Sequence, residues 1–196
     1  WANFGAEMPR FRMNDDREVT CYALLAEHVM GKDVRDKALA SWYEQREADE
    51  GCHLMAATLL HAQVFTVDDV WRKVRSATEA SRLRAARHAR SLLTPSPSDA
   101  LADLYQNPLR YLNSKASDGT RQAQELAAIT LARIANTDPE LAAASLRSRW
   151  HSALSPNLAA WAWAQVGKQA AQKTMPQAAE HFATALKVTD SATKRK

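Results

Sequence analysis

Apolar residues recur along this chain mainly at intervals of three and four, the spacing that gathers them on one face of an α-helix. In the first half of the sequence this pattern predicts helices at about 16–30, 33–50, 52–63, 67–78 and 81–93. In the second half it predicts two short helices broken at Asn107–Pro108, then longer ones at about 120–135, 139–154, 156–173 and 176–188. Alternating β-branched runs are absent from the sequence, so the predicted fold class is all-α.

Start and stop signals sharpen several of these boundaries. Asp16, at the end of the run Asn14–Asp16, is the expected N-cap of the first helix, and Gly31 is expected to end it in a left-handed conformation. Thr66 with Asp69 has the spacing of a capping box, and Ser81 is expected to open the helix that follows. The residues expected on buried faces are Val19, Tyr22, Ala23, Ala26, Val29, Met30, Val34, Ala38, Leu39, Trp42, Val67, Val70, Trp71, Val74, Thr78, Ala85, Ala86, Ala89, Leu92 and Leu93.

The connections between the predicted helices suggest how they are arranged. Two segments, Thr94–Ser98 and Ser114–Gly119, have the composition of linkers, and the other connections are short, which implies antiparallel neighbours. Trp161 and Trp163 point about 200° apart on one helix, so that helix is expected to be apolar on two sides, like an inner solenoid helix. We therefore predict one α-superhelical domain over residues 1–196, a solenoid or ring segment of helical hairpins.

One alternative is a tetratricopeptide-like adaptor that binds a peptide in a concave groove. Trp163 to Gly167, followed by Ala178, Phe182 and Ala185, nearly reproduces the spacing of that repeat, one residue short in the turn. Such an adaptor needs a ladder of Asn, Lys and Arg along its inner helices. The segment 158–171 is instead rich in Ala and Trp, which disfavours this function.

Composition and charge narrow the function classes further. The chain has 196 residues, and no run approaches the roughly 20 apolar residues that cross a bilayer. It begins at Trp1 without a signal-like segment, so we expect a mature or trimmed piece of a longer chain. The net charge is +4, and the part after residue 50 carries the whole basic excess. A basic helical nucleic-acid binder is a further alternative, although the dense basic stripe of such proteins is missing.

Cys21 and Cys52 are the two cysteines of the chain, one near the start of the first helix and one just past the second. A hairpin of about thirty residues returns the chain to the same end, which could bring the thiols within bridging distance. From spacing alone, a disulfide in an oxidising compartment and two unpaired buried thiols in a cytosolic protein remain equally open.

The sequence offers little for catalysis or metal binding. The candidate ligands Cys21, His28, Cys52, His53 and His61 lack any spacing typical of zinc sites. Every acidic residue is expected on an exposed face, in a cap or in a turn, so no desolvated acid is predicted. A nucleophile elbow and a Gly-rich phosphate loop are absent as well. We therefore expect no active site, no metal and no cofactor.

Residues 72–90 hold seven Lys and Arg side chains and a single acid, Glu79. Arg84, Arg87 and His88 are expected opposite the apolar face of their helix. The commoner interpretation of such a cluster is a solvated polar face. The functional interpretation is a surface that attracts an anionic polymer.

The run Pro9–Phe11, followed by Glu18–Leu25 (EVTCYALL), resembles the amino-terminal region of proteobacterial soluble lytic transglycosylases. In that family the catalytic domain is preceded by a long superhelix of short helices that curls into a ring, the U-type domain. The resemblance spans the chain from about Trp1 to Leu186, and its most specific residues lie between 9 and 52. It continues in order through Gly31, Trp42, Cys52, Asp69–Trp71, Asn107–Leu112, Asp138–Glu140 and Ala160–Trp161.

The resemblance implies a function that the residues alone do not. Enzymes of this family cleave the β-1,4 bond between N-acetylmuramic acid and N-acetylglucosamine in peptidoglycan and leave a 1,6-anhydro product. Their catalytic Glu–Ser motif and their Gly–Leu–Met–Gln segment are both missing from these 196 residues, so no catalytic residue carries over. The implied identity is a non-catalytic superhelical portion of a periplasmic enzyme, with glycan strands and its own catalytic domain as partners.

The resemblance also bears on individual residues. The family has paired cysteines in this region, so a disulfide between Cys21 and Cys52 is implied. Arg84, Arg87 and His88 are then candidate contacts for a glycan polymer that bears peptide carboxylates.

Overall fold

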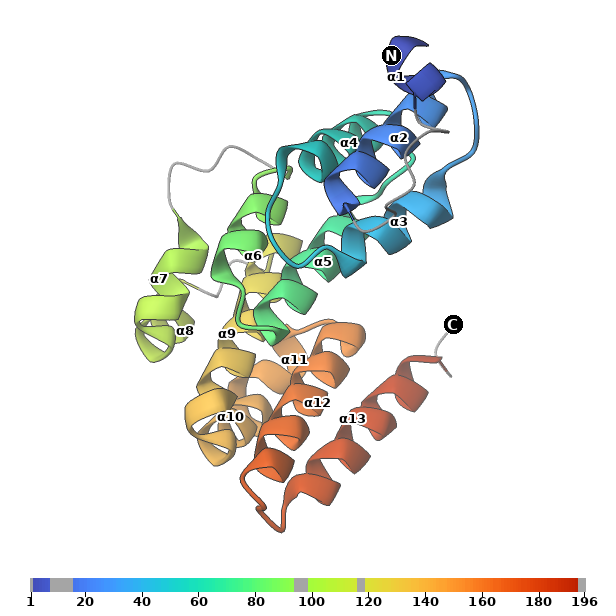
Figure 1. Cartoon of the computed structure of the whole chain (residues 1–196). Coiled ribbons are helices and arrows are strands. Elements are labelled where there is room, and N and C mark those ends of the chain that lie inside the picture. Colours follow the sequence, from blue (N-terminus) through green and yellow to red (C-terminus); the bar gives the residue numbers. More distant parts are fainter. Residues whose placement is uncertain (1, 8–15, 94–98, 116–118, 194–196) are drawn as a thin grey trace. The chain divides into compact units, whose positions relative to one another are not determined.

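The computed structural model describes residues 2–7, 16–93, 99–115 and 119–193, and within these ranges every regular element is a helix (Figure 1). The predicted all-α fold class is therefore confirmed. The chain divides into two compact units, Trp1–Pro97 and Ser98–Lys196. Their boundary falls in the predicted linker Thr94–Ser98, which lies outside the described ranges, as does Pro9–Phe11. A single superhelical domain over 1–196 stays a prediction, and the two units are described separately.

The described residues of the first unit form α1 (Ala2–Glu7), α2 (Arg17–Val29), α3 (Arg35–Glu44), α4 (Glu50–His61), α5 (Val67–Glu79) and α6 (Leu83–Arg90). Helix α2 packs against α3 and α4, α3 packs against α5, and α5 and α6 form a hairpin (Figure 1). Trp42 of α3 stacks on Phe65, with ring centroids 5.5 Å apart. The core side chains include Cys21, Leu25, Ala38, Trp42, Cys52, Met55, Leu59, Phe65, Val70, Trp71, Val74 and Ala86.

Two helix-start signals of the first unit behave as the sequence predicts. The Asp16 carboxylate accepts hydrogen bonds from the N–H groups of Glu18 and Val19 at the start of α2. Thr66 and Asp69 form the reciprocal hydrogen bonds of a capping box at the start of α5. Each of these caps depends on residues at most three positions apart, which is why sequence alone suffices to predict them.

Helices α2, α4, α5 and α12 end in the same way, with one residue at positive φ. These residues are Gly31, Gln63, Ser81 and Thr174, with φ of 82°, 58°, 58° and 54°. In each case its N–H and the following N–H donate to carbonyls in the last turn of the helix, the Schellman pattern. Gly31 is confirmed in this role. The expectation for Ser81 is wrong, because its backbone ends α5, and α6 begins at Leu83.

Other expectations about the first unit are corrected by its packing. Helix α4 begins at Glu50, capped by Asp49, so Gly51 lies inside this helix and not in front of it. Val29, Met30 and Val67 are 57%, 61% and 45% exposed, although the apolar pattern places them on buried faces. All three lie at helix ends, where fewer neighbouring side chains cover the apolar face.

The second unit contains α7 (Ala100–Gln106), α8 (Pro108–Lys115), α9 (Arg121–Thr137), α10 (Pro139–Ser145), the π-helix η2 (Leu146–Trp150), α11 (His151–Ala153), α12 (Pro156–Gln172) and α13 (Ala178–Thr193). Helix α12 packs against α9, α10 and α13, so it is covered on more than one side, as the spacing of Trp161 and Trp163 predicts. The single helix predicted at 139–154 is interrupted by η2, which the apolar pattern does not reveal.

Small side chains bring the helices of the second unit close together. Six of its alanines are completely buried where α9, α10 and α12 meet: Ala127, Ala128, Ala135, Ala142, Ala143 and Ala162. Gly167 of α12 faces the ring of Phe182 on α13, and a Cβ added to this glycine would lie 3.1 Å from the ring. The core of this unit is therefore formed by close helix contacts, with Leu146, Trp150 and Trp163 filling the wider spaces.

Candidate functional site

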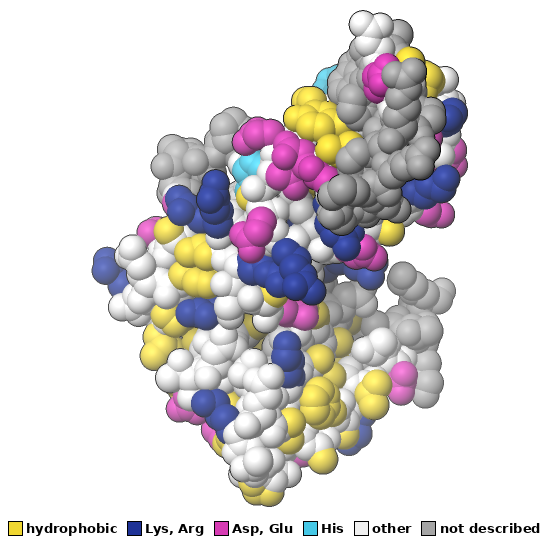
Figure 2. Space-filling view, in the orientation of Figure 1, with side chains coloured by type: hydrophobic (Ala, Val, Ile, Leu, Met, Phe, Trp, Pro, Cys, Tyr) yellow, Lys and Arg dark blue, Asp and Glu magenta, His cyan; other side chains and the backbone are white. Residues whose placement is uncertain are grey.

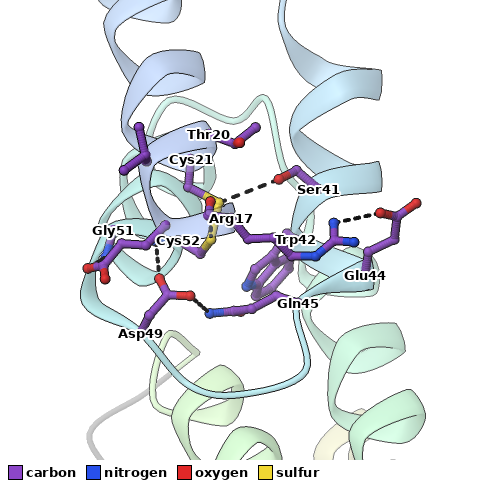
Figure 3. Close-up of a disulfide and its surroundings, with 12 residues drawn as sticks. Arg17, Thr20, Cys21, Ser41, Trp42, Glu44, Gln45, Asp49, Gly51 and Cys52 are labelled. Atoms are coloured by element: carbon purple, nitrogen blue, oxygen red, sulfur yellow. Dashed lines mark hydrogen bonds and ion pairs between the residues drawn. A yellow bond between two sulfur atoms is a disulfide. The ribbon is translucent and has the colours of Figure 1, made fainter. Parts of the chain in front are cut away.

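The structure bonds Cys21 of α2 to Cys52 of α4, with 4.9 Å between their Cα atoms (Figure 3). Both residues are completely buried. The hydroxyl group of Ser41 on α3 lies 3.7 Å from the Cys21 sulfur, so this bridge sits where three helices meet. A buried disulfide offers neither a thiolate nor a metal ligand, and its role is to tie α4 to α2.

Polar contacts around the disulfide hold the same helix junction. Asp49 accepts from the Cys52 N–H at 2.7 Å and also accepts from the side chain of Gln45 (Figure 3). Glu18 of α2 accepts from the Gly51 N–H at 3.0 Å. A Cβ on Gly51 would lie 2.9 Å from the backbone oxygen of Glu18, so only glycine allows this close approach of α4 to α2.

The predicted anion-contact residues lie on α6. Arg84 and Arg87 are exposed, and Ala85, Ala86 and Ala89 are buried on the opposite face. The apolar periodicity therefore places these two arginines correctly. Figure 2 shows Lys and Arg side chains over α5 and α6, with acidic side chains among them. We call the part of α6 that carries the exposed Arg84 and Arg87 and the half-buried His88 the α6 basic face.

His88 adds a contact that the sequence does not predict. Its ring stacks on that of His53 in α4, with centroids 4.1 Å apart and planes 29° apart. Burial, followed by the charge of His88, lowers the pKa of His53, while Glu50 and Asp49 act in the opposite direction. The stack attaches the α6 basic face to α4, the helix that the disulfide holds.

Not every basic residue of the 72–90 cluster faces solvent. Lys73 is 3% exposed, and its ammonium group donates to the carbonyls of Trp42 and Gln45 at 2.5 and 2.7 Å. It therefore satisfies two carbonyl groups at the C-terminal end of α3. Burial, followed by the charge of Arg82, lowers the pKa of Lys73 to about 8. Lys73 is a structural residue and not part of the anion-contact surface.

A second polar cluster joins α3 to α5. Arg35 lies 3.0 Å from the Asp69 carboxylate, and the Tyr43 hydroxyl group donates to the backbone carbonyl of Asp69 at 3.2 Å. Arg72 lies over the Tyr43 ring, 5.0 Å from its centroid. Burial and the Asp69 charge raise the pKa of Tyr43 to about 12. Burial alone would raise the pKa of Asp69, but its hydrogen bonds to Thr66 and Arg35 outweigh that effect and lower it.

His181 and Glu125 are buried titratable side chains of the second unit. His181 is completely buried, and its Nε2 lies 3.1 Å from Glu140 while its ring stacks on Trp163. Glu125 is 1% exposed and lies 3.6 Å from Arg121 on the same helix. The expectation that all acidic residues are exposed, in caps or in turns is therefore wrong at Glu125. The packing of α9 among its neighbours buries this position, which its own helix pattern does not indicate.

Within the described ranges, no group of three or more His, Cys, Asp or Glu side chains gathers as a metal site would. None of the described helices combines the length and the apolar character that crossing a bilayer demands.

Comparisons with known proteins give a structural match only. No protein-family model and no curated protein matches the chain. Among solved structures, it is similar to the X-ray structure of an inactive mutant of lytic transglycosylase Slt from Pseudomonas aeruginosa, with a TM-score of 0.69 and 19% sequence identity. The match covers 94% of this chain and 31% of that one, so this chain spans about a third of the protein that it matches. At this identity the likeness shows the fold.

Proposed function

We propose that this chain is the non-catalytic superhelical portion of a periplasmic peptidoglycan lytic transglycosylase. The parent enzyme would cleave the bond between N-acetylmuramic acid and N-acetylglucosamine and form 1,6-anhydro-muropeptides. The observation that carries the proposal is the fold match to lytic transglycosylase Slt over 94% of this chain. The residue pattern between Pro9 and Cys52, which resembles the same family, supports it independently.

The disulfide supports the proposed compartment. Buried disulfides persist in the periplasm and outside cells and are rare in the cytosol of most organisms. The bond between Cys21 and Cys52 joins two core helices, and such a bond favours an oxidising compartment. A periplasmic location also brings the chain to the compartment that holds peptidoglycan.

In this proposal the superhelix holds the catalytic domain and confines glycan strands. The α6 basic face would contribute long-range attraction, because peptidoglycan carries the carboxylates of its peptide stems. Arg84 and Arg87 are exposed and belong to a helix anchored through Ala85, Ala86 and Ala89. Their charges are thus held on a rigid element and presented to solvent.

Retention on purified peptidoglycan sacculi at low salt tests the proposed contact. We expect wild-type protein to sediment with sacculi, and Arg84→Glu/Arg87→Glu to remain mostly in the supernatant. The control is Lys37→Glu/Lys173→Glu, which changes the net charge equally at two exposed positions outside the α6 basic face. Equal retention of wild type and Arg84→Glu/Arg87→Glu would contradict the contact. Equal losses of retention in both double variants would also contradict it, because net charge alone would then explain the binding.

A further inference from the structure

A pocket of about 450 Å³ opens in the second unit. Helix α12 contributes one wall through Pro156, Ala159 and Trp163, which repeat at intervals of three and four. Helix α13 contributes the facing wall through Thr184 and Lys187. The volume lies within the range of small-molecule sites, roughly 300–1,000 Å³.

The remaining wall comes from the π-helix η2 and the short helix after it. Leu146, Arg147, His151 and Leu154 line the pocket from this side. The π-helix adds a residue to the turn, and such insertions often occur at functional sites. Leu146 and Leu154 are buried, whereas Arg147 and His151 are exposed. The pocket therefore has an apolar floor and a polar mouth.

The charged side chains at the mouth are mainly basic. Arg147 lies 5.5 Å above the Trp163 ring centroid and 3.7 Å from the Glu180 carboxylate. This ion pair is largely exposed and therefore weak, but together with the indole ring it restrains the guanidinium at the edge of the pocket. Lys187 lines the pocket from α13, and His151 adds a ring whose N–H can donate a hydrogen bond. Cations on two walls above an apolar floor match a small ligand with an apolar body and one carboxylate.

We infer that this pocket binds the terminal carboxylate of a short peptide with small apolar side chains. The carboxylate would lie between Arg147 and Lys187, where an arginine fork and a lysine ammonium group can both donate to it. Methyl-sized side chains would lie against Pro156 and Val188, the more accessible apolar residues of the lining. The inference does not depend on the α6 basic face, because the pocket lies wholly in the other unit.

Chemical-shift mapping on the ¹⁵N-labelled 196-residue chain tests this inference. The probe is N-acetyl-D-Ala-D-Ala, and its C-terminal amide is the matched control without the charge. We expect saturable shifts at amides of η2, α11, α12 and α13 with the acid, and at least tenfold weaker binding of the amide. Lys187→Gln should weaken binding about tenfold, whereas Lys173→Gln, an exposed lysine outside the pocket, should leave it unchanged.

The outcomes test separately whether the pocket binds a carboxylate and which kind of molecule supplies that carboxylate. Equal binding of acid and amide, shifts confined to other helices, or no shifts would overturn the inference. If N-acetyl-L-Ala-L-Ala binds as tightly as the D,D form, the carboxylate pocket is supported and ordinary protein C-termini are its source. Preference for the D,D form supports the pocket and points to cell-wall peptide stems. This measurement does not involve Arg84 or Arg87. A negative result would therefore rule out the pocket without bearing on the contact that sacculus retention tests.

Discussion

The two units of this chain are stabilised in different ways. In the first unit a disulfide and polar contacts join the helices. The disulfide bonds Cys21 to Cys52, the buried Lys73 donates to the carbonyls of Trp42 and Gln45, and the half-buried Arg35 pairs with Asp69. In the second unit small side chains let α9, α10, α12 and α13 approach closely. The comparison teaches that removing a single chemical group should damage the first unit more than the second.

The largest expected effect is loss of the disulfide. Closing a loop of this length, with a sequence separation of 31, stabilises a protein by about 3–4 kcal/mol in the chain-entropy model. Cys21→Ala/Cys52→Ala should therefore accelerate hydrogen exchange in α2 and α4 strongly. Exchange in α9 and α12 serves as the internal control and should not change. Equal acceleration in both units would contradict their separate stabilisation.

Two glycine substitutions compare close helix approaches in the two units. An added Cβ at Gly51 meets the backbone of Glu18 at 2.9 Å, which cannot move without displacing α2. At Gly167 it meets the ring of Phe182 at 3.1 Å, and this ring is 40% exposed and can rotate. We expect Gly51→Ala to lower the free energy of unfolding by about 2 kcal/mol. Gly167→Ala should be close to neutral, because helix propensity gains roughly 1 kcal/mol.

Thermal and urea unfolding of both alanine variants checks this difference. A larger loss for Gly167→Ala than for Gly51→Ala would show that α12 and α13 are packed more rigidly than the exposure of Phe182 indicates.

The next effect is the loss of stability expected when the buried ammonium group of Lys73 is removed. Lys73→Met leaves the carbonyls of Trp42 and Gln45 without this donor and should cost about 1–3 kcal/mol. The pKa of Lys73 is lowered to about 8 from an ordinary 10.5, so the unfolded chain binds more protons between these values. The stability of wild type relative to Lys73→Met should therefore rise from pH 8 to 10.5. Urea unfolding across this range measures it, and a fall would contradict the lowered pKa.

The smallest effect concerns the stack of His53 on His88. Because the pKa of His53 is lowered, the unfolded chain binds its proton first as the pH falls below 6.5. Wild type should thus lose stability relative to His53→Asn on acidification through this region. NMR titration of the His53 imidazole should give a midpoint below 6.5, and His88→Gln should move it upward. A midpoint at or above 6.5 would contradict the effect of burial.

Whether a structural feature could be predicted from the sequence depends on how far apart along the chain its residues lie. Asp16, Gly31 and the pair Thr66 and Asp69 act within one helical turn, so their roles follow from the sequence. The exposure of Arg84 and Arg87 likewise follows from one helical period. The prediction for Ser81 is wrong because serine is typical of helix starts. In the structure the N–H groups of Ser81 and Arg82 donate to carbonyls in the last turn of α5 and so end that helix.

The remaining features depend on contacts between distant segments. The stack of His53 on His88 and the burial of Lys73 and Glu125 arise only when separate helices pack together. The pocket combines residues from η2 to α13, and no single stretch of sequence contains its pattern. Local periodicity therefore predicts which face of a helix is exposed, but not which side chains of other helices cover it.

The most direct test of the proposed function is the affinity of the chain for soluble, uncrosslinked glycan strands that retain their peptide stems. We predict that Arg84→Glu/Arg87→Glu binds them far more weakly than wild type at low ionic strength. The difference should disappear near 1 M salt, where electrostatic interactions are screened within about 3 Å. Equal dissociation constants for the two proteins at low salt would contradict a glycan contact on the α6 basic face.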